Sequence, residues 1–210
     1  MCEKYYSISP YAYCADNPVR LVDPDGRVIT IHDINDRKSV LQMINSRAAG
    51  TFGINSKGNL YVIKKEGSSG FSTYYRDQLI KGINAKENID IAKGQTYKEN
   101  GVVKDVDKDA GGGVTLKTKE TTTDSEGKTT VSKEASITIS GNENTTLKDS
   151  EENPLQDQPA DILMHELVGH GIPFIVGADT GNAVENENKA RKELDPDNNC
   201  QRKQEPEHKE

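Results

Sequence analysis

The chain has little of what a large apolar core requires. Its 210 residues include no Trp, three Phe and three Met, and only 32% are hydrophobic while 29% are charged. Such a composition supports one modest domain together with solvent-exposed loops or a tail. No apolar run approaches the roughly 20 residues that a membrane-spanning helix needs, so we expect no membrane span.

Cysteine is also scarce, and positive charge is neither abundant nor clustered. The cysteines Cys2, Cys14 and Cys200 lie near the two ends of the chain, a placement that predicts neither a disulfide framework nor a cysteine metal site. The formal net charge is -7, and Lys and Arg are scattered. Binding to a phosphate backbone needs clustered cations, so no nucleic-acid partner is expected. The start, MCEKYYSISPYAYC, shows no signal peptide, and an export signal would have to be encoded elsewhere.

Residues 1–27 differ in composition from the rest of the chain. They contain four of the eight tyrosines and three of the eight prolines, and end in the turn sequence VDPDGR. Residues 3–27, which include the stretch KYYSISPYAYCADNPVRLVDPDGR, resemble the end of the RHS/YD-repeat-associated core domain. The resemblance implies that residues 1–27 are a core-end remnant followed by a variable toxin or effector domain. It also implies delivery outside the producing cell within a larger protein, and a possible cognate immunity protein as partner.

Residues 28–194 are predicted to form one α+β domain, and residues 195–210 a flexible tail. Helices are expected where apolar residues recur at helical spacing, and strands where they alternate between turn signals. The predicted strand is 28–32, the predicted helices are 35–50 (ending at Gly50) and 70–84 (capped by Ser72), and the predicted hairpins have arms within 51–65 and at 114–121 and 129–139.

The stretch ILMHELVGHGIP, residues 162–173, contains two histidines five residues apart. We expect a helix that begins at Pro159, is capped by Asp157 or Gln158, and stops at Gly171 and Pro173. Each α-helical residue turns by about 100°, so a spacing of five places two side chains roughly 140° apart. Such a pair cannot share one zinc ion on a regular α-helix. Two local changes would bring the histidines together, namely a π-bulge or a loosening of the helix at Gly169.

Each residue of this motif also has a structural explanation when taken singly. A histidine near a helix C-terminus complements the helix dipole, and Glu166 could be a surface residue. The combination H-E-x-x-G-H, however, should arise by chance in on the order of one in a few thousand chains of this length. HELVGH is similar to the H-E-x-x-G-H pattern of the dipeptidyl-peptidase III family. That resemblance implies zinc ligation by His165 and His170, with Glu166 as the catalytic residue.

A third ligand is expected in residues 180–194, which read as a short helix. Glu187 shares the apolar face of this helix, whereas Glu185 lies on the polar face. Because a buried carboxylate is costly unless it is paired or binds metal, Glu187 is the stronger candidate, and Arg191 is placed to orient it. The alternative is a simple Glu187–Arg191 ion pair. ENKAR, residues 187–191, also resembles the E-N-x-x-R third-ligand helix of RHS-associated metallopeptidase-like domains.

Together these features predict a zincin-like α+β fold with a small mixed or antiparallel sheet and an active-site helix. With His165, His170 and Glu187 as ligands, Zn²⁺ keeps its fourth position for water and lowers the pKa of that water toward about 7. Glu166 would take the proton, and the reaction would be hydrolysis of a polypeptide substrate. The alternatives are an inactive orphan cassette that binds a partner such as an immunity protein, and, less favoured by the acidic charge, a nuclease. Three residues remain open as donors to the oxyanion, namely Tyr74, Tyr75 and Arg191.

Overall fold

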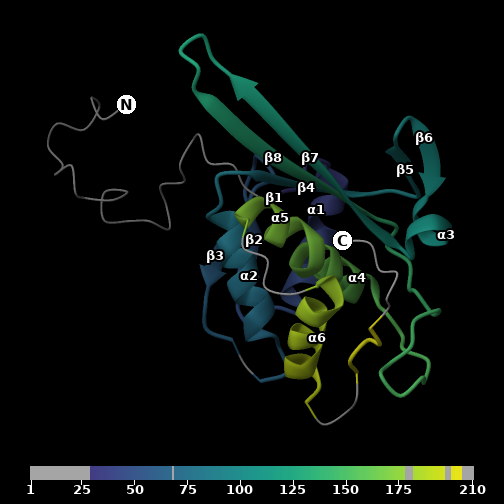
Figure 1. Cartoon of the computed structure of the whole chain (residues 1–210). Helices are drawn as coiled ribbons and strands as arrows, with labels where there is room; N and C mark the ends of the chain where they lie inside the picture. Colours follow the sequence, from purple (N-terminus) through teal and green to yellow (C-terminus); the bar gives the residue numbers. More distant parts are fainter. Residues whose placement is uncertain (1–28, 68, 178–181, 197–199, 205–210) are drawn as a thin grey trace, which may run out of the picture.

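The computed structural model describes residues 29–67, 69–177, 182–196 and 200–204 (Figure 1). The expected core-end remnant, residues 1–27, lies outside the described residues. Within them the chain forms a mixed α+β structure, as predicted, with one four-stranded sheet, two small two-stranded sheets and several helices. No helix in the described part is both long enough and apolar enough to cross a membrane.

The main sheet has the strand order β1-β4-β8-β7. The first three strands run parallel, and β7 is antiparallel to β8 at one edge. The β7–β8 hairpin confirms the predicted Thr-rich hairpin, and it extends from the body of the molecule in Figure 1. Strand β4, which lies between its two parallel neighbours β1 and β8, was not predicted. The strands are β1 Ile29–Thr30, β4 Asn88–Lys93, β7 Gly113–Thr123 and β8 Thr129–Ile139.

One face of this sheet carries the core, and the other is polar. Side chains alternate along β4 and β8, so that Ile89 and Ile137 are buried while Asp90 and Glu134 point outward. Gly171 lies against the buried face, where an added Cβ would be 3.2 Å from Ile137 Cδ1. The helical segments on this face are α4 Pro159–His165, η2 Glu166–Gly171 and α5 Ile172–Val176, and α6 Ala183–Leu194 packs on η2.

The predicted helices and the first hairpin are present, with one boundary moved. The first helix ends at Asn45, not at Gly50, because the Asn45 side chain pairs with the Phe52 backbone through bonds of 2.8 and 3.1 Å. The second begins after Ser72, whose Oγ accepts from Tyr75 N at 2.9 Å as a helix cap does. The bounds are α1 Ile34–Asn45, α2 Thr73–Ile83, β2 Thr51–Ile54 and β3 Leu60–Lys64. Three unpredicted short elements follow, namely β5 Thr96–Glu99, β6 Val102–Asp105 and α3 Val106–Ala110.

The segment 200–204 differs from the flexible tail expected after residue 194. The Asn188 side chain grips the backbone of Arg202, accepting from its N–H at 2.7 Å and donating to its C=O at 2.8 Å. Arg202 also forms an isolated β-bridge with Asp149, and its side chain is buried. These described residues are therefore part of the packed structure.

Glu193 of α6 caps the N-terminus of α2. Its carboxylate accepts hydrogen bonds of 2.8 Å from Tyr74 N, Ser72 Oγ and Thr73 Oγ1. Burial acts to raise the pKa of Glu193, but these donors outweigh it and the pKa is lowered. A carboxyl with a lowered pKa stabilises the fold above its unfolded pKa, and that contribution is lost as pH falls through the folded pKa.

We therefore expect Glu193→Ala to lower the free energy of unfolding by about 1 kcal/mol at pH 7, the usual size of a helix-cap contribution. The deficit should shrink only as the pH falls through the lowered folded pKa of Glu193, because the wild-type carboxyl then becomes protonated too. Urea denaturation at pH 7 and over a series of acidic pH values measures this, with Lys192→Ala as the exposed neighbouring control. An equal loss in both variants would contradict the assignment.

Candidate metal centre

A π-helical turn separates the two histidine positions: His165 directly precedes it, and His170 lies within it. The helix is α-helical through His165, π-helical over Glu166–Gly171 and α-helical again to Val176. A π-helix bonds residue i to i+5, so the wider turn absorbs the extra residue. The imidazole rings of His165 and His170 consequently meet, with centroids 5.0 Å apart and an interplanar angle of 83°. Of the two changes considered, the π-bulge is the one that the structure adopts.

The close approach of α6 requires a glycine within this turn. A Cβ at Gly169 would lie 2.8 Å from the Cβ of Ala183, too close for real atoms.

The predicted helix stop at Gly171 and Pro173 is wrong, and His170 therefore does not lie in a last turn. Pro173 is the second residue of α5 and lies just after the π-helical turn, so the helix continues past it. The helix ends instead at Gly177, with φ of 73°.

The predicted site residues are buried together. The exposed fractions are 5% for His165, 5% for Glu166, 7% for His170 and 0% for Glu187. Glu187 Oε2 lies 2.8 Å from His165 Nδ1. This contact links α6 directly to the histidine helix, the continuous helix over residues 159–176 that carries both histidines. Glu185, by contrast, is exposed. The structure thus brings together the four residues of the candidate site.

Two arginines neutralise the buried Glu187 carboxylate. Arg191 Nε donates to Glu187 Oε1 at 2.6 Å, and Arg191 also pairs with Asp157, a residue that the sequence offered as a helix cap. Arg202 Nη1 lies 3.6 Å from Glu187 Oε2. Burial acts to raise the pKa of Glu187, but Arg191 and His165 outweigh it and lower that pKa strongly. The Glu187–Arg191 ion pair considered as an alternative is therefore present, together with the contact to His165.

Glu166 is held by the edge strand of the sheet. Thr115 Oγ1 donates to Glu166 Oε2 at 2.6 Å, and a Cβ at Gly113 would lie 3.0 Å from Glu166 Oε1. Burial raises the pKa of Glu166, although His165 and Thr115 act in the opposite direction. Thr115 and Arg202 were not predicted as site residues, and only the fold places them here. Neither belongs to a local motif that could have revealed it.

The chemistry of these donors fits zinc, because two imidazoles and a carboxylate are common zinc ligands. The distance between two of these donors, however, is shorter than tetrahedral zinc requires. Two donor atoms on one tetrahedral zinc are about 3.3 Å apart, given bonds near 2.0–2.1 Å. The 2.8 Å between His165 Nδ1 and Glu187 Oε2 is a hydrogen-bond distance. Within the described ranges, no group of three or more His, Cys, Asp or Glu side chains is arranged to hold a metal ion.

In this arrangement the Glu187 carboxylate contacts a ring nitrogen of His165. A carboxylate at one ring nitrogen of a histidine fixes the tautomer and leaves the other nitrogen for a metal. Burial acts to lower the pKa of His165, but the Glu187 carboxylate outweighs it, and the pKa is raised. Glu187 and His165 could bind one ion together only if His165 used Nδ1, and the distance from Nδ1 to Glu187 Oε2 would then have to widen from 2.8 Å to about 3.3 Å.

The three candidates for an oxyanion donor are all engaged or remote from solvent. Tyr74 Oη donates to Asn186 Oδ1 at 2.9 Å, and Arg191 is occupied by Glu187 and Asp157. Tyr75 is fully buried in the core, where burial strongly raises the pKa of its hydroxyl. None of them is presented to a substrate in this arrangement.

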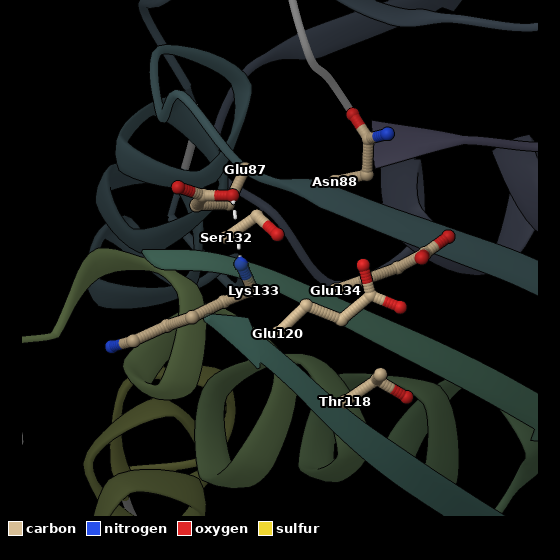
Figure 2. Close-up of a pocket in the computed structure, with 7 residues that line it drawn as sticks. All are labelled: Glu87, Asn88, Thr118, Glu120, Ser132, Lys133 and Glu134. Carbon is tan, nitrogen blue, oxygen red and sulfur yellow. Dashed lines mark hydrogen bonds between the residues drawn. The ribbon is translucent and has the colours of Figure 1, made fainter. Parts of the chain in front are cut away.

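A shallow acidic pocket lies on the outer face of the sheet, away from the histidines. Figure 2 shows the Lys133 side chain directed away from Glu120 and Glu134. The Lys133 backbone N–H donates to Glu87 Oε2 at 2.9 Å. The pocket contains no histidine or cysteine, and we assign it no function. Its lining residues are Glu87, Asn88, Thr118, Glu120, Ser132, Lys133 and Glu134.

Comparisons with known proteins add no relatives. The chain matches no family model, and no curated protein or solved structure is significantly similar to it. Functional inference therefore rests on the sequence motifs and on the geometry described above.

Loss of the Thr115 hydroxyl should destabilise the protein, because it leaves the buried Glu166 carboxyl without this donor. We expect Thr115→Val to lower the free energy of unfolding by about 1–3 kcal/mol, the cost of an unsatisfied buried polar group. Thr118→Val is the matched control, since Thr118 is exposed on the opposite face of the same strand. Thermal or urea denaturation compares the two, and indistinguishable variants would argue against a bond between Thr115 and Glu166.

Proposed function

We propose that the chain is a zinc-dependent metallopeptidase with a zincin-like architecture. The observation that carries this proposal is the π-helical turn, which brings the five-spaced His165 and His170 into contact. On a regular α-helix the two histidines of the H-E-x-x-G-H sequence could not chelate one ion. A π-helical turn with buried histidines and an adjacent buried carboxylate is typical of a functional site rather than of a simple core helix.

The proposed roles follow from the contacts. His165 and His170 would hold the metal, and Glu187 would either orient His165 or complete the ligand set. Zinc, when bound, supplies a Lewis acid that polarises the scissile carbonyl group. Glu166 is the residue that would accept and return a proton. Its raised pKa suits this role, because a general base works best when its pKa lies near the working pH.

The edge strand β7 supports a peptide as substrate. Within the described part of the chain β7 pairs only with β8, so its other edge is open to an added strand. An extended peptide can bind such an edge through main-chain hydrogen bonds. Thr115 lies in β7 and contacts Glu166, so a peptide paired with this strand would pass beside the proposed base.

The place of the domain in a larger system is proposed on the sequence alone. The resemblance of residues 3–27 to the end of an RHS core domain supports a role as a toxin or effector cargo, delivered outside the producing cell. A cognate immunity protein would be the expected partner.

The rival proposal is an inactive cassette that folds and binds a partner without chemistry. It is favoured by the burial of all four site residues and by the hydrogen-bond distance between His165 and Glu187. Metal content separates the two proposals.

We expect purified wild type to bind about one zinc ion per chain, as a mononuclear catalytic site does. Glu187→Ala should lose most of this zinc, because the variant removes both a potential ligand and the partner of His165 Nδ1. Glu185→Ala, on the exposed face of the same helix, should keep it. Elemental analysis after dialysis against zinc measures the content. Wild type that cannot be loaded with zinc would favour the inactive cassette.

Glu166→Gln should abolish hydrolysis and leave zinc binding in place. The amide still accepts a hydrogen bond from Thr115, but it cannot take a proton, and loss of a general base typically costs on the order of 10²–10⁴-fold in rate. Casein hydrolysis by zinc-loaded wild type and variant, with Glu185→Gln as control, tests this. Equal rates in the Glu166 variant and wild type would remove Glu166 from the mechanism. Cleavage of nucleic acid but not casein would favour the nuclease.

A further inference from the structure

Arg202 brings a buried positive charge to the candidate metal centre from a distant part of the sequence. Its Nη1 lies 3.6 Å from Glu187 Oε2, the same oxygen that contacts His165 Nδ1. The side chain is 9% exposed. A guanidinium is buried at considerable cost unless it is paired, so its placement beside a buried carboxylate calls for an explanation.

The segment that carries Arg202 is held on both sides. On one side the Asn188 side chain makes two hydrogen bonds with the Arg202 backbone, at 2.7 and 2.8 Å. On the other side Lys203 N donates to Lys148 O at 3.0 Å, and Ser150 N donates to Gln201 O at 3.2 Å. The backbone of residues 201–203 is therefore fixed between α6 and the loop at 148–150. The Cα of Arg202, from which the side chain extends to Glu187, is therefore fixed in position.

We propose that Arg202 is a positioning residue, anchored by Asn188, that holds Glu187 on His165. Arg191 grips Oε1 of the carboxylate and Arg202 faces Oε2, so the two arginines oppose rotation of the carboxylate away from the histidine. Three residues of the ENKAR stretch, residues 187–191, then have a role at the site. Glu187 contacts the histidine, Arg191 fixes the carboxylate, and Asn188 fixes the segment that supplies the second arginine.

The consequence for His165 is a fixed tautomer. An ionised acceptor at Nδ1 keeps the ring proton on that nitrogen and leaves the lone pair on Nε2, the form of imidazole that binds a metal. This effect does not depend on the proposed function. Its consequence for metal affinity does rest on that function, so the two are measured separately.

The first measurement is nitrogen-15 NMR of the histidine rings in metal-free protein, at a pH where His165 is neutral. Wild type and Lys203→Gln, the matched neighbouring control, should show a protected Nδ1–H on His165. Arg202→Gln and Asn188→Ala should lose that protection or show mixed tautomers, while Arg202→Lys, which keeps the charge, should retain most of it. An unchanged signal in Arg202→Gln overturns the proposal. If Arg202→Gln does not fold, Asn188→Ala and Arg202→Lys decide the question in the same way.

The second measurement is zinc affinity, by competition with a chromophoric chelator. Arg202→Gln should bind zinc about tenfold more weakly, the lower end of the effect of removing a residue that supports a ligand. Arg202→Lys should recover most of the loss. Tighter binding by Arg202→Gln would mean that Arg202 merely repels the ion, and would overturn the proposal. If wild type binds no zinc but the NMR signals behave as expected, the peptidase proposal fails and the positioning role of Arg202 stands.

Discussion

The buried carboxylate of Glu187 is the constraint on which the rest of this centre depends. A charge with no exposure to water is unfavourable unless it is surrounded by opposite charge and hydrogen-bond donors. Here three partners come from separate segments, namely His165 from the histidine helix, Arg191 from α6 itself and Arg202 from the segment 200–204. The Glu187 carboxylate therefore connects the helix that carries the histidines, α6 and the segment 200–204, which are not joined to one another by strand pairing in the main sheet. Asp157 extends the network through Arg191 to the start of the histidine helix.

The π-helical turn is the second part of the same arrangement. A regular α-helix would place His165 and His170 on different sides, and only one could face α6. The wider turn brings both rings together, and Gly169 within it lets Ala183 approach closely enough for Glu187 to reach His165. The turn also places Glu166 against β7 and the following residues against the sheet core. Histidine geometry, helix packing and sheet contacts are thus satisfied by one local irregularity.

Local signals in the sequence predicted much of the fold and only part of the site. Ser72 correctly predicted the start of α2, and the turn signal between the two Thr-rich arms correctly predicted the β7–β8 hairpin. Both signals could be read from the sequence because cap and turn chemistry act over a few residues. Spacing alone placed Glu187 on the buried face of α6. The choice between a π-bulge and a loosened helix was open, because it depends on the contact between Gly169 and Ala183. Thr115 and Arg202 were missed because long-range folding, not a local pattern, brings them to the site.

The enclosure of this centre has a consequence for any reaction there. For the proposed hydrolysis a peptide would have to reach Glu166, and because the site residues are buried, a covering element would have to move. The sheet and the helices are joined by continuous ladders and core packing, whereas the described segment 200–204 is held by single hydrogen bonds to the Asn188 side chain and to the loop at 148–150. Segments held by few backbone bonds open at lower free energy than core elements do. Any opening that displaces the segment 200–204 also withdraws Arg202 from Glu187. In such a protein, access to the site and the state of the His165–Glu187 pair would be linked through a single arginine.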